Sequence, residues 1–155
     1  GYQPGVSKLK FSRFIGACKN EAPLVLGGTS VLPINGQIVL RGNNTRYVSL
    51  LPGSEVTVNQ NNKSDAEIFT VLDAGNGKVA LRASNGKYVT IDGSQFGRVK
   101  ANGNSVGSSA KFVVEALASG GISIKASNGK YVQAAYSSGG VLLANLNSPQ
   151  KFTYQ

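Results

Sequence analysis

The 155-residue chain contains no histidine, no tryptophan and no methionine, and its one cysteine is Cys18. Without histidine, the sequence excludes a histidine base that could activate a serine or cysteine nucleophile. A zinc site made of cysteine and histidine is excluded as well, because Cys18 stands alone. For the same reason no internal disulfide can form, so cysteine usage does not indicate a cellular compartment. We therefore predict no catalytic site, no metal site and no cofactor.

Long apolar runs and acidic side chains are also scarce. No run approaches the length of about 18 residues that a membrane span requires, so we expect no transmembrane segment. Of the seven acidic residues, Glu55, Asp65, Glu67 and Asp73 lie near one another in the sequence. A pair of carboxylates could in principle serve a glycosidase. Their positions in loops and at repeat boundaries instead favour solvated side chains.

Positive charge is plentiful by contrast. Sixteen Lys and Arg residues against seven acids give a formal net charge of +9. A basic surface that only keeps the protein soluble would account for this charge. The sharper interpretation is an anionic partner, which could be an acidic polysaccharide, phospholipid headgroups, nucleic acid or the acidic face of a protein filament.

A repeated segment organises the rest of the sequence. It occurs at residues 38–50, 79–91 and 122–134, and its tyrosines Tyr47, Tyr88 and Tyr131 are 41 and 43 residues apart. A fixed period of this size indicates a repeat architecture. Each copy begins with apolar residues two apart, which is the alternation of a half-buried strand, and then turns into a second strand.

The turn inside each copy contains an asparagine. The dipeptides at this turn are Asn44-Thr45, Asn85-Gly86 and Asn128-Gly129. Asn-Gly supplies positive φ angles for a tight hairpin at little steric cost, whereas Asn-Thr is a weaker turn former. We therefore predict a positive φ at both glycines. Residues 75–78 resemble a fragment of a phosphate-binding loop, but they lack its spacing and following helix and are predicted to form a hairpin between repeats.

Two more strands are predicted in each repeat. Third strands are expected at 56–59, 99–102 and 142–145, and fourth strands with a phenylalanine at 68–71, 111–114 and 151–154. Three repeats of four strands predict an all-β fold, the β-trefoil, in which a six-stranded barrel is capped by three hairpins. The repeats are placed at 34–72, 73–117 and 118–155, after an N-terminal extension at 1–33. The repeated Tyr, Val and Phe residues are expected to form the core near the pseudo-threefold axis.

This repeat resembles the β-trefoil repeat of the fascin family over residues 34–155. The matching residues of the second repeat are Leu81, Arg82, Ala83, Asn85, Gly86, Lys87, Tyr88, Val89, Ala101, Asn102 and Phe112. Those of the third are Ile124, Lys125, Ala126, Asn128, Gly129, Lys130, Tyr131, Val132, Ala144, Asn145 and Phe152. The first repeat departs from the pattern at Gly42, Thr45 and Val58. Because these are turn and core positions, the resemblance specifies a fold more than a function.

The resemblance implies several kinds of partner. Similar repeats occur in actin-bundling proteins, in modules attached to secreted bacterial glycosidases and, more distantly, in heparin-binding growth factors. Sugar-binding trefoils of the ricin type carry a Gln-x-Trp motif in each repeat. That mode of galactose binding is disfavoured here, because the chain has no tryptophan.

Cations recur on both sides of the repeated turn. The six residues are Arg41, Arg46, Arg82, Lys87, Lys125 and Lys130. Their apolar stems could simply cover barrel edges while the charged groups remain in water. Alternatively, they form three basic sites that bind the sulfates, uronates or phosphates of an anionic polymer. Nucleic acid is a less favoured partner, because the tyrosines are expected in the core rather than among the basic residues.

We expect a non-catalytic, secreted β-trefoil module that recognises carbohydrate or another anionic extracellular polymer through these basic hairpins. The absence of a starting methionine suits a processed, exported protein. One alternative is a cytoplasmic actin-binding or actin-bundling protein. Another is the subunit of an extracellular filament, because the apolar residues of 1–33 could form either a strap on the barrel or an arm that joins copies into a homo-oligomer.

Overall fold

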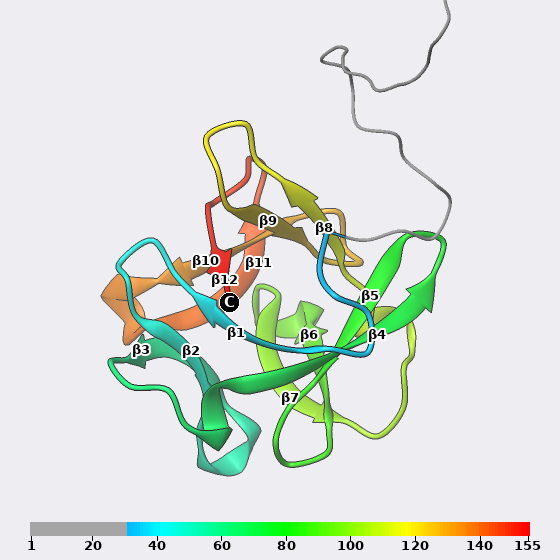
Figure 1. Cartoon of the computed structure of the whole chain (residues 1–155), viewed down its shortest axis with the longest axis horizontal. Coiled ribbons are helices and arrows are strands. Elements are labelled where there is room, and N and C mark those ends of the chain that lie inside the picture. Colours follow the sequence, from blue (N-terminus) through cyan, green and yellow to red (C-terminus); the bar gives the residue numbers. More distant parts are fainter. Residues whose placement is uncertain (1–30) are drawn as a thin grey trace, which may run out of the picture.

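Residues 31–155 are described by a computed structural model, and they form twelve β-strands joined by short turns (Figure 1). The predictions made for Cys18 and, apart from residues 31–33, for a strap or assembly arm concern residues that lie outside this described part. The all-β prediction is confirmed. Within residues 31–155, no helix is long and apolar enough to cross a membrane.

Six strands pair in a closed ring and form a barrel. They are β1 (Gln37–Arg41), β4 (Ile68–Gly75), β5 (Lys78–Arg82), β8 (Val113–Ala116), β9 (Ile122–Lys125) and β12 (Thr153–Tyr154). Four of the six junctions are antiparallel ladders: β1 with β4, β4 with β5, β8 with β9, and β12 with β1. The other two junctions are single bridges, between Val79 and Phe112 and between Ile122 and Phe152.

The other six strands form three hairpins that cap one end of this barrel. They are β2 (Tyr47–Leu50), β3 (Val56–Gln60), β6 (Tyr88–Asp92), β7 (Arg98–Gly103), β10 (Tyr131–Ala135) and β11 (Val141–Leu146). β2 pairs with β3, β6 with β7 and β10 with β11. The hairpins also pair with one another, because β11 contacts both β3 and β7. The barrel and its cap confirm the predicted β-trefoil.

The repeated segment itself is not a long hairpin, which corrects the sequence-based interpretation. Its two strands pair through one residue pair in each repeat: Arg41 with Tyr47, Arg82 with Tyr88, and Lys125 with Tyr131. Beyond that pair the first strand continues in the barrel and the second enters the cap. The long ladders therefore join the second strand to the third, or the fourth strand to the next repeat.

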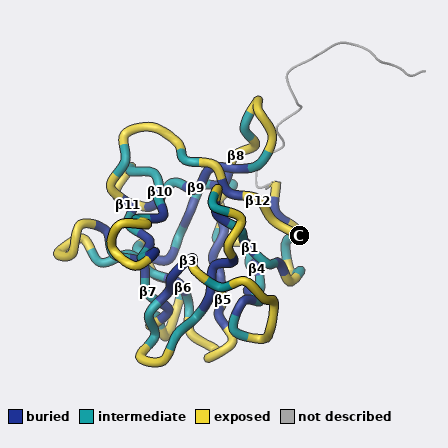
Figure 2. The backbone as a smooth tube through the Cα atoms, turned by 90° about the vertical axis from the view of Figure 1, so that its left-hand side faces the viewer, coloured by how far each residue is buried: buried dark blue, intermediate teal, exposed yellow. Residues whose placement is uncertain are grey.

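Apolar side chains from all three repeats fill the barrel. Phe69, Phe112 and Phe152 are fully buried, and so are the valines that follow the repeated tyrosines. Figure 2 shows burial concentrated on the strands and exposure on the loops around them. The prediction of a tyrosine core is only partly right, because Tyr47 is buried whereas Tyr88 and Tyr131 are half-buried. Packing begins before the first strand, since Leu32 belongs to the core.

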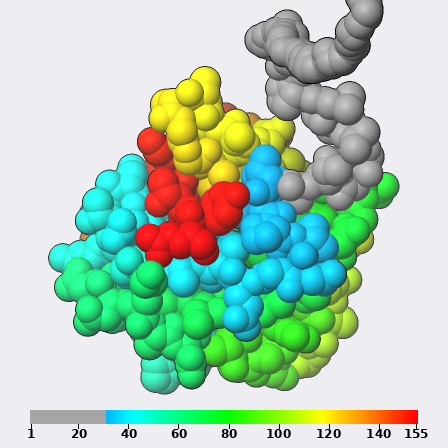
Figure 3. Space-filling model, viewed as in Figure 1, coloured from blue at the N-terminus to red at the C-terminus, as the bar shows by residue number. Residues whose placement is uncertain are grey.

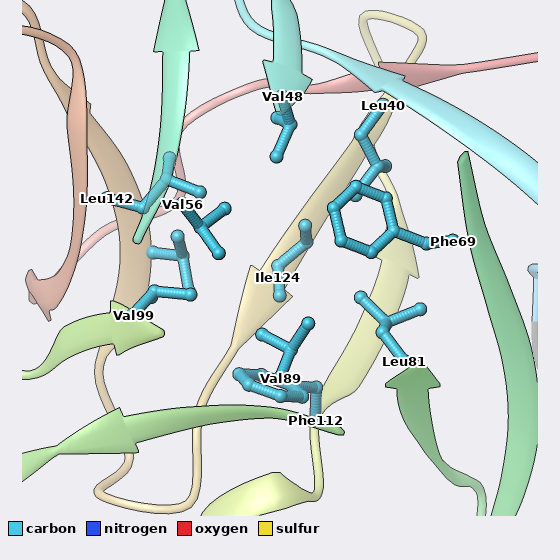
Figure 4. A pocket seen from close by; sticks show the side chains of 11 residues that line it. Leu40, Val48, Val56, Phe69, Leu81, Val89, Val99, Phe112, Ile124 and Leu142 are labelled. Atoms are coloured by element: carbon cyan, nitrogen blue, oxygen red, sulfur yellow. The ribbon is translucent and has the colours of Figure 1, made fainter. Parts of the chain in front are cut away.

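The side chains on the barrel axis leave a small apolar cavity of about 30 Å³ (Figure 4). Equivalent residues of the three repeats surround it, including Leu40, Leu81 and Ile124 from the first strand of each repeat. A void of this size and character is too apolar to hold water with hydrogen bonds, so it remains dry. It is therefore a packing defect of the core and not a ligand site.

The turns differ from expectation in one respect. Gly86 and Gly129 have a φ of 79°, as predicted, and Thr45 has a φ of 67° at the equivalent position. The preceding asparagines, however, keep a negative φ, so these turns are not the type that needs two left-handed residues. That type occurs between β4 and β5, where Asn76 and Gly77 have φ angles of 54° and 78°. The predicted hairpin between the first two repeats is thereby confirmed.

Candidate functional site

Two of the three cations that end the first strands, Arg41 and Lys125, pack on the repeated tyrosines. The Arg41 guanidinium lies 4.8 Å from the centre of the Tyr47 ring and donates a hydrogen bond to its hydroxyl at 3.0 Å. Lys125 lies 5.4 Å from the centre of the Tyr131 ring. Such contacts hold a cation over the electron-rich face of an aromatic ring and stabilise both side chains. For Arg41 and Lys125, packing on a tyrosine therefore explains how the side chain is positioned.

The cations that open the second strands reach across to the third. Arg46 donates through Nη1 to the Asn59 carbonyl at 3.3 Å. Lys87 donates to the side-chain oxygen of Asn104, and Lys130 donates to that of Asn147 at 2.5 Å. Lys87 and Lys130 thus make equivalent contacts with the asparagine just after the third strand, whereas Arg46 binds a backbone carbonyl within that strand. Each contact keeps its cation beside its own turn, and the three cations do not converge on one point.

Arg41, Arg46 and Arg82 line three different grooves. The one at Arg46, here called the Tyr136 groove, is lined by Asn44, Arg46, Val58, Asn59, Tyr136, Gly139 and Gly140. One wall comes from the first repeat and the other from the turn between β10 and β11. The two walls are joined by the Asn59 amide, which donates to the Gly139 carbonyl at 3.3 Å, and by a backbone bond from Val58 to Gly140 of 2.8 Å.

Tyr136 presents an aromatic face in this groove. Its side chain is 39% exposed, and its hydroxyl donates to Asn43 Oδ1 while it accepts a bond from the Asn44 amide at 3.3 Å. The ring is thus fixed in place by its polar end and open on its apolar face. Rigid aromatic surfaces of this kind bind ligands with little loss of conformational entropy.

A second groove lies on the other side of the same turn. The Arg41 groove is lined by Arg41, Gly42, Asn43, Thr45, Lys151, Phe152 and Thr153. Lys151 was not among the six predicted cations, because it belongs to a fourth strand and has no cationic equivalent before Phe69. The Nε atom of Arg41 is buried and makes no hydrogen bond within residues 31–155. Arg41 and Lys151 together make this groove electropositive.

The groove at Arg82 has a different electrostatic character. Asp65 lines it together with Arg82, so its positive charge is partly offset. Of the four acidic residues predicted to be solvated, Asp65 and Asp73 are exposed, whereas Glu55 and Glu67 are not. Glu67 is only 3% exposed and accepts hydrogen bonds from the hydroxyls of Ser49 and Ser64, and Glu55 forms ion pairs with Arg98 and Lys100. Each of these two carboxylates is therefore bound by neighbouring side chains, so the prediction of solvated acidic side chains is wrong for Glu55 and Glu67.

The asparagine of each repeated turn has a role that turn statistics did not reveal. Its Oδ1 accepts a bond from the backbone amide two residues on, and its Nδ2 donates to a carbonyl of the third strand. Those carbonyls belong to Val58, Ala101 and Ala144, at 3.3, 3.0 and 2.9 Å. Asparagine is thus needed to fasten the turn to the cap. An amide that both accepts and donates is the sequence signal for this role.

Ligation of a metal is not supported by the geometry. Within residues 31–155, no three side chains of His, Cys, Asp or Glu gather closely enough to hold an ion. What the two grooves beside the first turn offer is a fixed aromatic face, amide groups and three cations. That combination can bind the C–H face and the acidic groups of a sugar chain by non-covalent contacts.

The fold is shared with other threefold proteins. A designed threefold symmetric protein, ThreeFoil, superimposes with a TM-score of 0.68 at 16% identity over 76% of this chain and 96% of that one. A lectin of Polyporus squamosus, bound to a human-type influenza-binding epitope, gives a TM-score of 0.69 at 14% identity. That match covers 80% of this chain but only 50% of the lectin. At these identities the likeness concerns the fold alone.

Sequence comparison specifies the family. No curated protein matches the chain. The model of the Fascin domain, however, matches residues 43–154, which include most of the first repeat, all of the second and all but the last residue of the third. The resemblance first noted in the repeated turn and the Ala-Asn of the third strands therefore extends over most of the sequence. The chain belongs to the fascin domain family.

Proposed function

We propose that this chain is a non-catalytic module that binds an acidic polysaccharide across its first hairpin turn. The observation that carries the proposal is the Tyr136 ring, which is fixed by Asn43 and Asn44 and exposed beside Arg46. A pyranose ring can place its C–H face on such an aromatic surface while its hydroxyls meet neighbouring amides. The trefoil fold shared with a lectin supports this choice of ligand class.

The negative groups of the ligand would contact three cations. Arg46 uses one guanidinium N–H on the Asn59 carbonyl, and a guanidinium has five such donors. Arg41 and Lys151 lie on the other side of the turn. Among residues 31–155, no carboxylate lines either groove, in contrast to the groove at Arg82. A chain that carries uronates or sulfates would therefore run from the Tyr136 groove over the turn to the Arg41 groove. Secretion of the protein is part of this proposal.

Binding to heparin, hyaluronan and neutral dextran, measured by isothermal titration calorimetry, tests the proposal. We expect both acidic polymers to bind in dilute buffer and the neutral one to bind far more weakly. Replacement Tyr136→Ala should weaken binding by about tenfold or more, the effect of losing an aromatic contact worth at least about 1.4 kcal/mol. The affinity should also fall steeply with salt, because counterions compete for the cations.

Lys130→Ala is the matched control, because Lys130 holds the position of Arg46 in the third repeat. We expect Arg46→Ala to weaken binding and Lys130→Ala to leave it within about twofold. Equal losses in the two variants would mean that the net charge of the surface, and not this groove, attracts the polymer. Absence of binding to every acidic glycan of a printed array would overturn the proposal.

Family membership favours a second candidate, binding to an acidic protein filament such as actin. Bundling requires two filament sites, which one domain supplies only through two faces or through self-association. Co-sedimentation with actin filaments at low salt separates the candidates. If the Tyr136→Ala variant still pellets with actin filaments, a filament partner is favoured. If the original chain does not pellet with actin, the polysaccharide remains the favoured ligand.

A further inference from the structure

The connection between β6 and β7 exposes a large apolar side chain. Phe96 is 81% exposed, the highest value among the large hydrophobic side chains that stand out from the described surface. It also has a φ of 58°, in the left-handed region. A bulky L-residue in this region carries backbone strain, and an isolated phenylalanine in water gains nothing from burial.

The other two cap hairpins show what the fold itself prefers here. Gly53 and Gly139 occupy the equivalent position, with φ angles of 80° and 79°. Glycine adopts this conformation without a steric penalty. Phe96 thus conflicts with both the backbone and the solvent, and nothing within residues 31–155 offsets the conflict. Such local conflicts are typical of sites that contact a partner.

A complementary apolar surface lies on the opposite side of the molecule. We name it the Tyr154 groove, and it is lined by Val31, Ala116, Gly121, Ile122, Thr153 and Tyr154. The Tyr154 hydroxyl donates to the Val31 carbonyl at 2.9 Å, which fixes one wall. Figure 3 shows this region of the surface, where the last strand lies between the start of the described chain and the β8–β9 hairpin.

An acidic residue lies beside Phe96 and a basic residue beside the groove, while Arg98 and Lys100 also lie near Asp92, and Glu115 precedes Ala116 of the groove lining. Asp92 lies at the base of the Phe96 turn, where it accepts bonds from the amide and hydroxyl of Ser94. Lys151 lies beside the Tyr154 groove, where its stem covers Gly121 and its ammonium donates to the Ser119 carbonyl at 3.3 Å. A second copy that inserts Phe96 into the groove would bring an anion toward a cation.

We infer that Phe96 of one copy inserts into the Tyr154 groove of a second copy, and that this contact joins chains head to tail. The cap hairpins β6–β7 and β10–β11 lie on the left in Figure 2, and β12 lies on the right. Phe96, here called the knob, and the Tyr154 groove therefore lie at different ends of the molecule. A contact between unlike surfaces leaves one knob and one groove free in every dimer, so association continues into open oligomers.

Sedimentation velocity of the full chain over a range of concentrations, in buffer of physiological salt, tests the inference. We expect the average mass to rise with concentration, and Phe96→Gly to weaken association by about thirtyfold, the effect of losing an aromatic anchor worth about 2 kcal/mol. Phe96→Gly should fold at least as well as the original chain, because glycine suits this φ. Tyr136→Ala removes an exposed aromatic from the same end and should leave association unchanged.

A mixing experiment tests the geometry of the contact. Ala116→Arg should block the groove, since Ala116 is an exposed residue of its lining, and should leave the knob intact. Each variant alone should remain monomeric, and an equimolar mixture of Phe96→Gly and Ala116→Arg should form dimers and nothing larger. The inference is overturned if the full chain stays monomeric at millimolar concentration. It is also overturned if Phe96→Gly associates normally or if the mixture fails to dimerise.

Discussion

Thr45 holds a backbone conformation that a β-branched residue rarely adopts. Its φ of 67° corresponds to the 79° of Gly86 and Gly129 in the other two repeats. The left-handed region costs an ordinary residue about 1–2 kcal/mol, and glycine avoids this cost. Glycine also makes the unfolded chain more flexible, which lowers the stability of the folded state by about 0.5–1 kcal/mol. Thr45→Gly should therefore raise the free energy of unfolding by about 0.5–1 kcal/mol, as measured by urea denaturation.

The reciprocal substitution provides the control. A Cβ at Gly86 would meet no atom within 4 Å, so Gly86→Thr introduces backbone strain and no clash. We expect it to lower stability by about 1–2 kcal/mol, and Gly86→Val to do the same. Effects of the same sign at positions 45 and 86 would contradict the equivalence of the two turns.

The turn asparagines should contribute through both ends of the amide. In Asn85→Ala the Lys87 amide loses an acceptor at 2.9 Å and the Ala101 carbonyl loses a donor at 3.0 Å. Two lost hydrogen bonds correspond to about 1–3 kcal/mol of stability. Thermal unfolding of Ser84→Ala, one residue away and exposed, should change by less than about 0.5 kcal/mol. A similar loss of stability in both variants would indicate that any substitution in the turn is destabilising, and that the two hydrogen bonds of Asn85 are not the cause.

Asp92 provides a test that depends on pH. Hydrogen bonds from the Ser94 hydroxyl and then the Ser94 amide lower the pKa of this carboxyl below its ordinary value. A pKa that is lower in the folded state stabilises the fold above the unfolded pKa, and this contribution is lost as pH falls through the folded pKa. Ser94→Ala should therefore raise the pKa of Asp92 in an NMR titration and reduce stability near neutral pH but not in strong acid.

The equivalent loop of the third repeat gives the comparison. There Ala135 stands in place of Asp92, so no carboxylate faces the following serines. Ser137→Ala should leave the pH dependence of stability unchanged. If both serine variants shift that dependence equally, its origin lies outside the Asp92 turn.

At the scale of elements, the cap hairpins determine how well the core is filled. Their third strands contribute Val56, Val99 and Leu142 to the axial cavity, so only the third repeat supplies the larger side chain. Val99→Leu adds one methylene toward a void of about 30 Å³. We expect it to raise stability by up to about 0.8 kcal/mol, the value of one buried methylene. Leu142→Val should lower stability, and a gain in that variant would mean that the cavity is already strained.

The elements were predictable because their positions repeat. Apolar alternation and the spacing of Tyr47, Tyr88 and Tyr131 located all twelve strands, and these features reflect burial, which the fold imposes on every repeat. Tyr136 and Phe96 escaped prediction because the other repeats have different residues at the equivalent positions. A pattern averaged over three copies conceals residues that occur in one copy.

Long-range polar contacts were beyond a pattern-based prediction for a different reason. Glu67 is buried because Ser49, in another strand, donates to it, and sequence spacing alone does not bring that pair together. Likewise the Arg41 groove needed Lys151 from the last repeat. The six predicted cations stay predictions as a binding site, since the structure assigns packing contacts to several of them and brings only three of them to grooves.

At the scale of the whole molecule, stability is shared by the three repeats. Each repeat supplies two strands of the barrel ring, and the junctions between repeats include single bridges such as Val79 with Phe112. Removal of residues 118–155 would open the ring and expose the core, so we expect the fragment 1–117 to remain unfolded by circular dichroism. A cooperative melting transition of that fragment would contradict the shared barrel.

The ring is completed by its first and last strands, because β1 pairs with β12 through Leu40 with Tyr154 and Arg41 with Thr153. These partners are separated by nearly all of the described chain. Closing so long a loop is entropically unfavourable until the intervening contacts have formed, and folds dominated by such pairings fold slowly. A ribosome that synthesises this domain therefore presents an incomplete barrel until β12 has been made. The aggregation-prone surface of the barrel is protected only after Tyr154 has emerged, so synthesis of β12 controls when the domain folds in the cell.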